Sequence, residues 1–378
     1  MVNKFLNSIE FILLFLMIFL VFTPFESKSA EWLFYGNYIF IISLLIISFF
    51  LSKFRFKFNL DLILVLLIFI LIFGFSAIRG ENSSYGYFFV LNLSLLFGFV
   101  FFSYLRVRVD LVIQTLKIYI LFNFIAITYQ FIYFFIFQDI FSFHSLVFPF
   151  SEDRGAIVSK VDLGRFSGFH NEPGTYGTWM SFAIIALMIL EKKPSVIAYL
   201  GIFSLLITLS ATSMVYFILL TSILILEKIK NKKFISLMIF FFCFLILSYT
   251  ILFNLGLFEY FRLRFFDSDI SNDGTTALKI LAFEHLLNSE DKRFLLGSGF
   301  GINDCYNCFS LQDNGLAFNL FFYFGIFFIP IVFLILKIAK PNNMYHWLAI
   351  ILIFVSKASI YNCAIWVLLF IIRSSRNR

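Results

Sequence analysis

The side chains best suited to catalysis or ligand binding lie at the end of the first polar stretch, residues 138–172. Arg165, His170 and Glu172 stand there directly before an apolar segment. A carboxylate or imidazole can act as a general base, and the planar guanidinium of arginine suits bidentate contact with phosphate. Glu172 also precedes a proline, which is typical of the first turn of a helix, where a carboxylate interacts favourably with the helix dipole. Both interpretations of Glu172 stay open, and Asn171 could orient either neighbour.

A second polar stretch, residues 255–314, adds basic residues and a carboxylate. Arg262 and Arg264 are flanked by aromatic residues, and we expect them to bind an anionic substrate rather than serve solubility alone. Asp313 stands just before another apolar segment. It is a candidate N-cap, and it is equally a candidate second carboxylate that faces the first.

Neither stretch predicts a metal site or a cofactor. Cys305 and Cys308 form a single Cys-x-x-Cys pair, and without a second pair zinc is not expected. Disulfide and free thiols both remain open for these cysteines. The acidic residues of 267–273 miss the spacing of an EF-hand loop. The glycine-rich run 296–301 lacks the strand and helix of a dinucleotide-binding fingerprint.

The rest of the chain is strongly apolar. Hydrophobic residues make up 61% of its 378 residues and charged residues 13%, whereas a soluble domain carries roughly twice that share of charge. The apolar runs are of helix length and do not alternate, so they predict an all-α polytopic membrane protein rather than a β-barrel. The net charge of +7 is explained by basic residues that set topology, and no nucleic-acid partner is expected.

We expect about 12 transmembrane helices in a single integral membrane domain, residues 1–378. With the amino terminus in the cytoplasm, the short basic connections all fall on the inside, as the positive-inside rule requires. Both termini are then cytoplasmic, and the two polar stretches are larger extracytoplasmic loops. The predicted apolar segments are residues 8–24, 33–52, 59–78, 87–105, 111–137, 174–190, 195–210, 212–227, 234–254, 315–337, 345–356 and 360–372.

Three charged residues fall within or beside these segments. Glu10 and Asp61 stand near the inner ends of their helices, where we expect them to snorkel to water. Lys357 stands at the outer turn of the last helical hairpin, where it could reach an anionic headgroup or substrate. Charges at membrane depth are costly, so each is a candidate functional residue.

Three segments, taken in order, carry a family pattern. Residues 165–173 read Arg-x-x-Gly…Glu-Pro before a helix, and residues 296–301 read Leu-Gly-x-Gly-x-Gly. Residues 313–315 read Asp-x-Gly and are followed by Gly-Ile at 325–326. This ordered trio, with two large outer loops among about a dozen helices, resembles the Wzy-type repeat-unit polymerases of bacterial O-antigen and capsule synthesis, within the O-antigen polymerase/ligase superfamily.

The resemblance implies an inverting glycosyltransferase of the GT-C class at the outer face of the bacterial inner membrane. Such enzymes join oligosaccharide units carried on undecaprenyl pyrophosphate into surface polysaccharide, without a cofactor or metal. By that likeness, catalytic residues would activate the acceptor hydroxyl; the candidates are Glu172, His170 and Asp313. Others would bind the substrate and its pyrophosphate; these candidates are Arg165, Arg262, Arg264, Lys279, Asn171 and Asn314.

Two departures and two alternatives accompany this expectation. Lys279 stands where the family often has an arginine, and Asp313 and Asn314 stand where its ligases usually show a histidine, which favours a polymerase. The first alternative is a ligase that transfers glycan to a lipid core or protein. The second is a polysaccharide exporter or flippase, which should show charged or broken helices along a midplane path. A chain-length regulator and a flippase are the expected protein partners.

Overall fold

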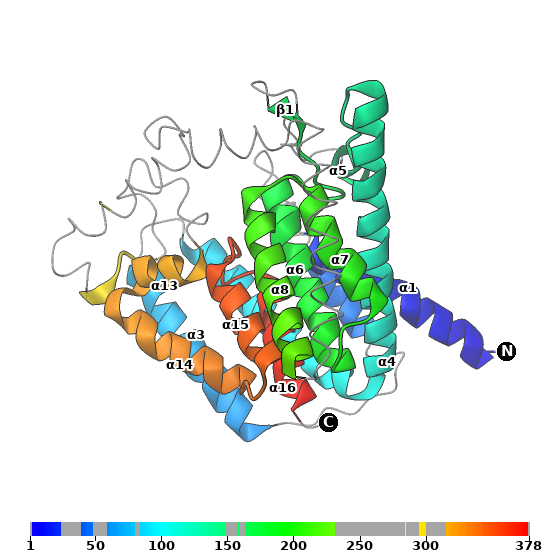
Figure 1. The fold of residues 1–378 in the computed structure, drawn as a ribbon. Coiled ribbons are helices and arrows are strands. Elements are labelled where there is room, and N and C mark those ends of the chain that lie inside the picture. Colours follow the sequence, from blue (N-terminus) through cyan, green and yellow to red (C-terminus); the bar gives the residue numbers. More distant parts are fainter. Residues whose placement is uncertain are drawn as a thin grey trace.

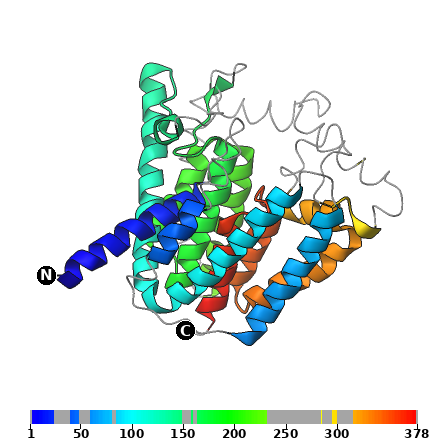
Figure 2. The ribbon, with the colours of Figure 1, turned by 180° about the vertical axis from the view of Figure 1, so that it is seen from behind.

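A computed structural model describes residues 2–23, 39–47, 59–79, 84–148, 157–158, 163–230, 284, 295–299 and 315–376. Within these ranges the chain is almost entirely α-helical, and its helices pack side by side as a bundle (Figures 1 and 2). The predicted all-α membrane fold is confirmed at this level. The predicted segment 234–254 lies outside the described residues.

Most of the described helices overlap the predicted apolar segments. The described helices are α1 (Val2–Phe22), α3 (Leu60–Arg79), α4 (Ser84–Phe137), α5 (Phe143–Val147), α6 (Pro173–Glu191), α7 (Val196–Ile207), α8 (Ala211–Lys230), α13 (Leu316–Phe324), the 3-10 helix η2 (Gly325–Phe327), α14 (Phe328–Ala339), α15 (Met344–Val355) and α16 (Cys363–Ser375). Residues 39–47 are also helical. Two short strands, β1 (Ile157–Val158) and β2 (Leu163–Gly164), pair antiparallel.

Four stretches of described helix are long and apolar enough to cross a membrane. They are Leu60–Arg79, Tyr85–Phe137, Pro173–Glu191 and Leu316–Ala339. The third, in α6, is 94% buried over its most apolar window, whereas the first is 33% buried. Large apolar side chains therefore cover the outside of the bundle on helices such as α3, where Leu71 and Ile78 are exposed. Such a surface suits lipid, so the described part is a membrane-embedded bundle.

Helix α4 joins two segments that the sequence predicted separately, residues 87–105 and 111–137. The break between them is Arg108, whose φ of −118° and ψ of 33° are not helical. Figure 2 shows the two halves of α4 leaving this point in different directions. A straight helix of 53 residues would span about 80 Å, more than twice the roughly 30 Å of hydrocarbon. The kink therefore divides α4 into two lengths that each fit a bilayer.

The expectation that Glu10 snorkels to water is wrong. Glu10 is 2% exposed, and its Oε1 lies 3.1 Å from Nε of Arg108 at the kink of α4. The Tyr104 hydroxyl donates to the same carboxylate oxygen at 2.8 Å. The carboxylate is buried because two partners on α4 compensate for its loss of water.

Helix α6 lies at the centre of the bundle, in contact with α4, α7, α8, α15 and α16. It approaches α8 closely at Gly177, where a Cβ atom would lie 2.9 Å from Cα of Ser213. Membrane helices lack a hydrophobic driving force between one another, so small residues that allow close packing stabilise their contacts. Gly177 thereby sets the spacing between the first turns of α6 and α8.

The glycine-rich run of the sequence acts as a cap for helix α13. Ser298 and Gly299 donate their backbone N–H groups to the carbonyls of Phe322 and Tyr323 at 2.9 and 3.0 Å. Gly297 has a φ of +69° and packs so tightly that a Cβ atom would overlap the backbone of Tyr323. Both features require glycine. The last carbonyls of α13 thus gain partners where the helix ends.

The predicted single helix 315–337 is broken at Gly325, which has a φ of +56°. The guanidinium of Arg79 holds the break and the glycine-rich turn together. It donates to the carbonyl of Gly297 at 3.0 Å and that of Tyr323 at 3.3 Å, and also to the carbonyl of Leu296. The glycine pattern of this segment therefore has a structural role, which residue types alone did not show.

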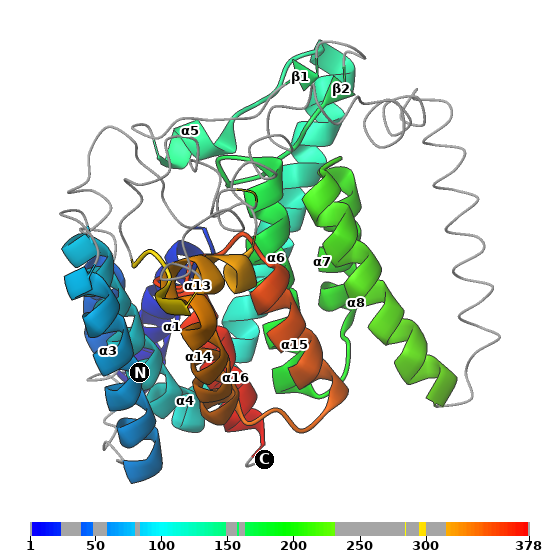
Figure 3. The same ribbon diagram turned by 90° about the vertical axis from the view of Figure 1, so that its left-hand side faces the viewer.

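The two ends of the bundle carry different features. In Figures 1 and 3, α5 and the β1–β2 hairpin lie at one end, and the α14–α15 connection and the carboxyl terminus lie at the other. At the latter end, Arg373 donates to the carbonyls of Lys337 and Ile338 at 3.2 and 3.0 Å. The basic connections that the sequence assigns to the inside, at α14–α15 and beyond α16, thus lie together.

The close approach at Gly177 leads to a prediction on stability. The substitution Gly177→Ala should destabilise the α6–α8 contact by about 1–3 kcal/mol, because an added methyl group overpacks a tight site. Gly74→Ala is the matched control, since its Cβ would meet Phe88 at an ordinary 3.5 Å and alanine favours a helix. Thermal unfolding in detergent should show a lower midpoint for the first variant alone. Equal midpoints would show that the contact is loose.

Candidate functional site

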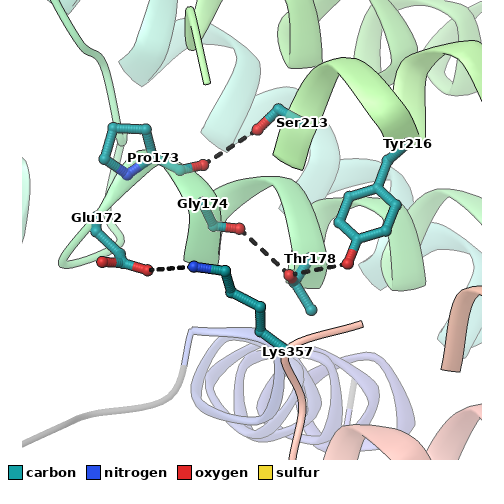
Figure 4. Close-up of polar contacts among 7 residues, drawn as sticks. All are labelled: Glu172, Pro173, Gly174, Thr178, Ser213, Tyr216 and Lys357. Carbon is teal, nitrogen blue, oxygen red and sulfur yellow. Dashed lines mark hydrogen bonds and ion pairs between the residues drawn. The ribbon is translucent and has the colours of Figure 1, made fainter. Parts of the chain in front are cut away.

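The sequence motif at residues 165–173 ends at an accessible carboxylate. Pro173 is the first residue of α6, as predicted, and Glu172 precedes it with extended backbone angles of −149° and 155°. Among the described residues, the Glu172 side chain caps no backbone N–H of α6. Its Oε1 instead lies 3.9 Å from Nζ of Lys357 (Figure 4). The carboxylate is therefore held beside a cation rather than used as a helix cap.

Lys357 reaches this carboxylate from the irregular segment between α15 and α16. Its side chain is 26% exposed and that of Glu172 27% exposed. An ion pair with this much access to water contributes only about 0–1 kcal/mol to stability. Fold stability thus gives little reason to place two charges at the end of an apolar bundle, which favours a functional role for the pair.

Hydroxyl groups from α6 and α8 surround the first turn of α6 (Figure 4). Ser213 donates to the Pro173 carbonyl at 3.1 Å, and Thr178 donates to the Gly174 carbonyl at 3.2 Å. The Thr178 hydroxyl also lies 3.4 Å from that of Tyr216. These bonds fix the start of α6 against α8. Their hydroxyl groups make one side of the site polar. Sequence reasoning missed this, because isolated hydroxyl residues in apolar helices form no periodic pattern.

Gly174 lies beside both charges and is buried. A Cβ atom at this position would lie 3.4 Å from the carboxylate of Glu172 and 3.8 Å from Nζ of Lys357. The hydroxyl of Thr212 would lie 3.7 Å from the same Cβ atom. An alanine at this position would therefore contact both charged groups.

The backbone that leads to Glu172 is packed inside the bundle. Residues 166–171 are buried although they are not helical. Gln130 of α4 accepts from the N–H groups of Ser167 and Gly168 at 3.2 and 2.8 Å, and it donates to the Phe141 carbonyl at 2.7 Å. Non-helical backbone inside a membrane bundle requires such partners. Gln130 thereby fixes the path of the motif.

His170 lies in the interior, away from the open side of the Glu172–Lys357 pair. It is 1% exposed, with Nε2 3.4 Å from the Tyr119 hydroxyl and its ring edge-on to Tyr176 at 5.2 Å. Burial, with a smaller contribution from the nearby His144, lowers the pKa of His170 to about 3. The imidazole is therefore neutral at physiological pH and positions the motif within the bundle.

The structure places two more predicted residues in this segment. Arg165 is half-buried at its start, and Asn171 is buried beside Glu172. The remaining predicted residues lie outside the described residues: Arg262, Arg264, Lys279, Cys305, Cys308, Asp313 and Asn314. The N-cap of α13 is Gly315, so Asp313 does not occupy the N-cap position, and its other candidate role, as a second carboxylate, stays a prediction.

The start of α13, just after the second polar stretch, lies beside the segment that carries Lys357. Leu316, the first residue of α13, donates its N–H to the carbonyl of Ser356 at 3.1 Å. Ser356 directly precedes Lys357, and a Cβ atom at Gly315 would lie 3.2 Å from the carbonyls of Phe354 and Val355. The segment around Lys357 thus contacts both the start of α6 and the start of α13.

No described part of the chain offers a metal site, since no three His, Cys, Asp or Glu residues in these ranges gather as ligands. The candidate site can instead supply proton transfer at Glu172 and a positive charge at Lys357. In comparisons with known proteins, no protein-family model, curated protein or solved structure matches the chain.

The hydrogen bonds by which Gln130 holds the backbone of Ser167 and Gly168 can be tested directly. Gln130→Met should leave the buried N–H groups of Ser167 and Gly168 without an acceptor, at about 1–3 kcal/mol for each group. Hydrogen exchange at residues 165–172 should then accelerate by about tenfold or more. Thr128→Ala, which removes a bond within α4 itself, is the control. Unchanged exchange in Gln130→Met would show that the segment is held by other contacts.

Burial of His170 predicts how stability depends on pH. The pKa of His170 is about 3 in the folded chain against an ordinary 6.5, so below pH 6.5 the unfolded chain binds more protons. This contribution to stability is complete above pH 6.5 and is lost as pH falls toward 3. His170→Gln should flatten the fall in unfolding midpoint between about pH 7 and pH 4. Tyr176→Phe should keep it, and an unchanged slope in His170→Gln would contradict the assignment.

Proposed function

We propose that this protein is a glycosyltransferase that polymerises oligosaccharide repeat units carried on undecaprenyl pyrophosphate. The observation that carries the proposal is the pairing of Glu172 with Lys357. It joins a carboxylate from the motif that resembles repeat-unit polymerases to a cation from a distant loop. The pair is accessible, whereas the residues that lead to it are buried. A proton acceptor beside a positive charge is what this transfer requires.

In the proposed reaction, Glu172 accepts the proton of the acceptor sugar hydroxyl. The hydroxyl oxygen attacks the anomeric carbon of the donor with inversion, so that a glycosidic bond forms and the bond to the pyrophosphate oxygen breaks. The electron pair of that bond leaves with undecaprenyl pyrophosphate. Lys357 and Arg165 stabilise the negative charge that develops on this leaving group.

The proposal includes about 12 membrane spans, a GT-C-like architecture and cytoplasmic termini in the bacterial inner membrane. Its support is the separation of features between the two ends of the bundle. The basic connection α14–α15 and the basic end of α16 lie at the end opposite to α5 and the β1–β2 hairpin. The positive-inside rule assigns that basic end to the cytoplasm, which leaves Glu172 and Lys357 toward the outer leaflet.

The first test is complementation of a chromosomal deletion, with surface polysaccharide resolved on a gel. Loss of a general base costs about 100-fold or more in rate. Glu172→Gln should therefore abolish the long-chain ladder and leave a single repeat unit attached, and Lys357→Gln should shorten it strongly. Lys193→Gln, an exposed lysine after α6, is the control and should restore the full ladder.

Three outcomes would contradict the proposal. A full ladder from Glu172→Gln at normal protein level would exclude Glu172 as the base. Long lipid-linked polymer that reaches no final acceptor in the deletion strain would favour a ligase. Accumulation of lipid-linked units on the cytoplasmic face would favour a flippase or exporter.

A further inference from the structure

A second polar site lies at the kink of α4, where α1 crosses it. A cavity of about 580 Å³ opens there, lined by residues of both helices. This volume falls in the range of small-molecule sites, roughly 300–1,000 Å³. Arg108, the residue at the kink of α4, is among its lining residues. The site is separate from Glu172, and the inference does not rest on the proposed function.

The charged lining of the cavity includes one buried group, the carboxylate of Glu10. Glu10 is 2% exposed and is paired with Nε of Arg108 at 3.1 Å. The Arg108 side chain remains 36% exposed, so its other N–H groups can donate to an occupant. Asp110, which is exposed, and Gln114 one turn further along α4 also line the cavity.

The rim of the cavity is apolar and faces outward. Ile12 and Val107 both line it, and they are 56% and 48% exposed. Phe11 and Leu111 continue this apolar lining. Exposed apolar side chains at a membrane bundle contact acyl chains. An occupant that satisfies the rim and the charged lining together is therefore an amphiphile with a charged head.

The charges that line the cavity indicate which kind of headgroup it would bind. Among the described residues that line the cavity, Glu10 and Arg108 neutralise each other, and the carboxylate of Asp110 is the remaining charge. A positive group suits Asp110, and a phosphate suits the remaining N–H groups of Arg108. We propose that this cavity binds the headgroup of a zwitterionic aminophospholipid, with its ammonium at Asp110 and its phosphate at Arg108. A lipid whose head carries phosphate alone leaves Asp110 unpaired.

The proposal is tested by native mass spectrometry of the delipidated full chain in detergent. Phosphatidylethanolamine, phosphatidylglycerol of the same acyl chains and soluble phosphoethanolamine are added separately. The wild type should bind phosphatidylethanolamine about fivefold more tightly than phosphatidylglycerol, as expected for one exposed ion pair. Asp110→Asn should remove this preference, and Asp139→Asn, an exposed carboxylate at the far end of α4, should keep it.

A second pair of variants tests the phosphate contact. Arg108→Gln should weaken both lipids, whereas Arg106→Gln, a neighbouring arginine that stacks on Phe102 at 4.3 Å, should not. Thermal unfolding without lipid identifies a variant that has lost its fold. If Arg108→Gln is such a variant, the lipid preference of Asp110→Asn, which leaves the Glu10–Arg108 pair in place, tests the proposal. Equal binding of both lipids by the wild type, or equal loss with Asp139→Asn, overturns the proposal. Tighter binding of soluble phosphoethanolamine than of the lipid overturns the assignment to a membrane lipid.

Discussion

The structure of this site depends on one constraint: backbone that leaves helical geometry inside an apolar bundle must find hydrogen-bond partners. Residues 166–171 are such a segment, and Gln130 and His144 hold it by three bonds to its backbone. Phe166 adds a bond to the carbonyl of Thr208 at 3.3 Å. Because this path is fixed from several sides, Glu172 emerges at a defined point at the start of α6.

The three motif segments perform different tasks at the same end of the bundle. The first delivers Glu172, and the second caps α13 with the glycines of residues 296–299. The third begins α13 against Ser356 and so supports Lys357. A change in the glycine-rich turn would therefore act on the candidate site through α13 and the loop that carries Lys357. The glycine-rich turn can affect Lys357 in this way although the two are far apart in the sequence.

Sequence reasoning predicted the helices well, because apolar runs of about 20 residues specify membrane helices. It also placed the start of α6 at Pro173. It missed the joining of two segments at Arg108, whose guanidinium pairs with a buried carboxylate, Glu10, from another helix. Residue type likewise suggested His170 as a base. Its burial between Tyr119 and Tyr176 depends on contacts over long separations, which no local pattern contains.

The looseness of the Glu172–Lys357 pair is compatible with turnover in the proposed reaction. At 3.9 Å and with both side chains about a quarter exposed, the pair is weak, because water screens such charges. A pyrophosphate offers Lys357 more negative charge and more acceptor oxygens than one carboxylate does. Binding of the donor lipid would therefore draw Lys357 toward the leaving group and release Glu172 toward the acceptor hydroxyl. A buried, tightly bonded pair could not exchange partners in this way, since each separated charge would lack compensation.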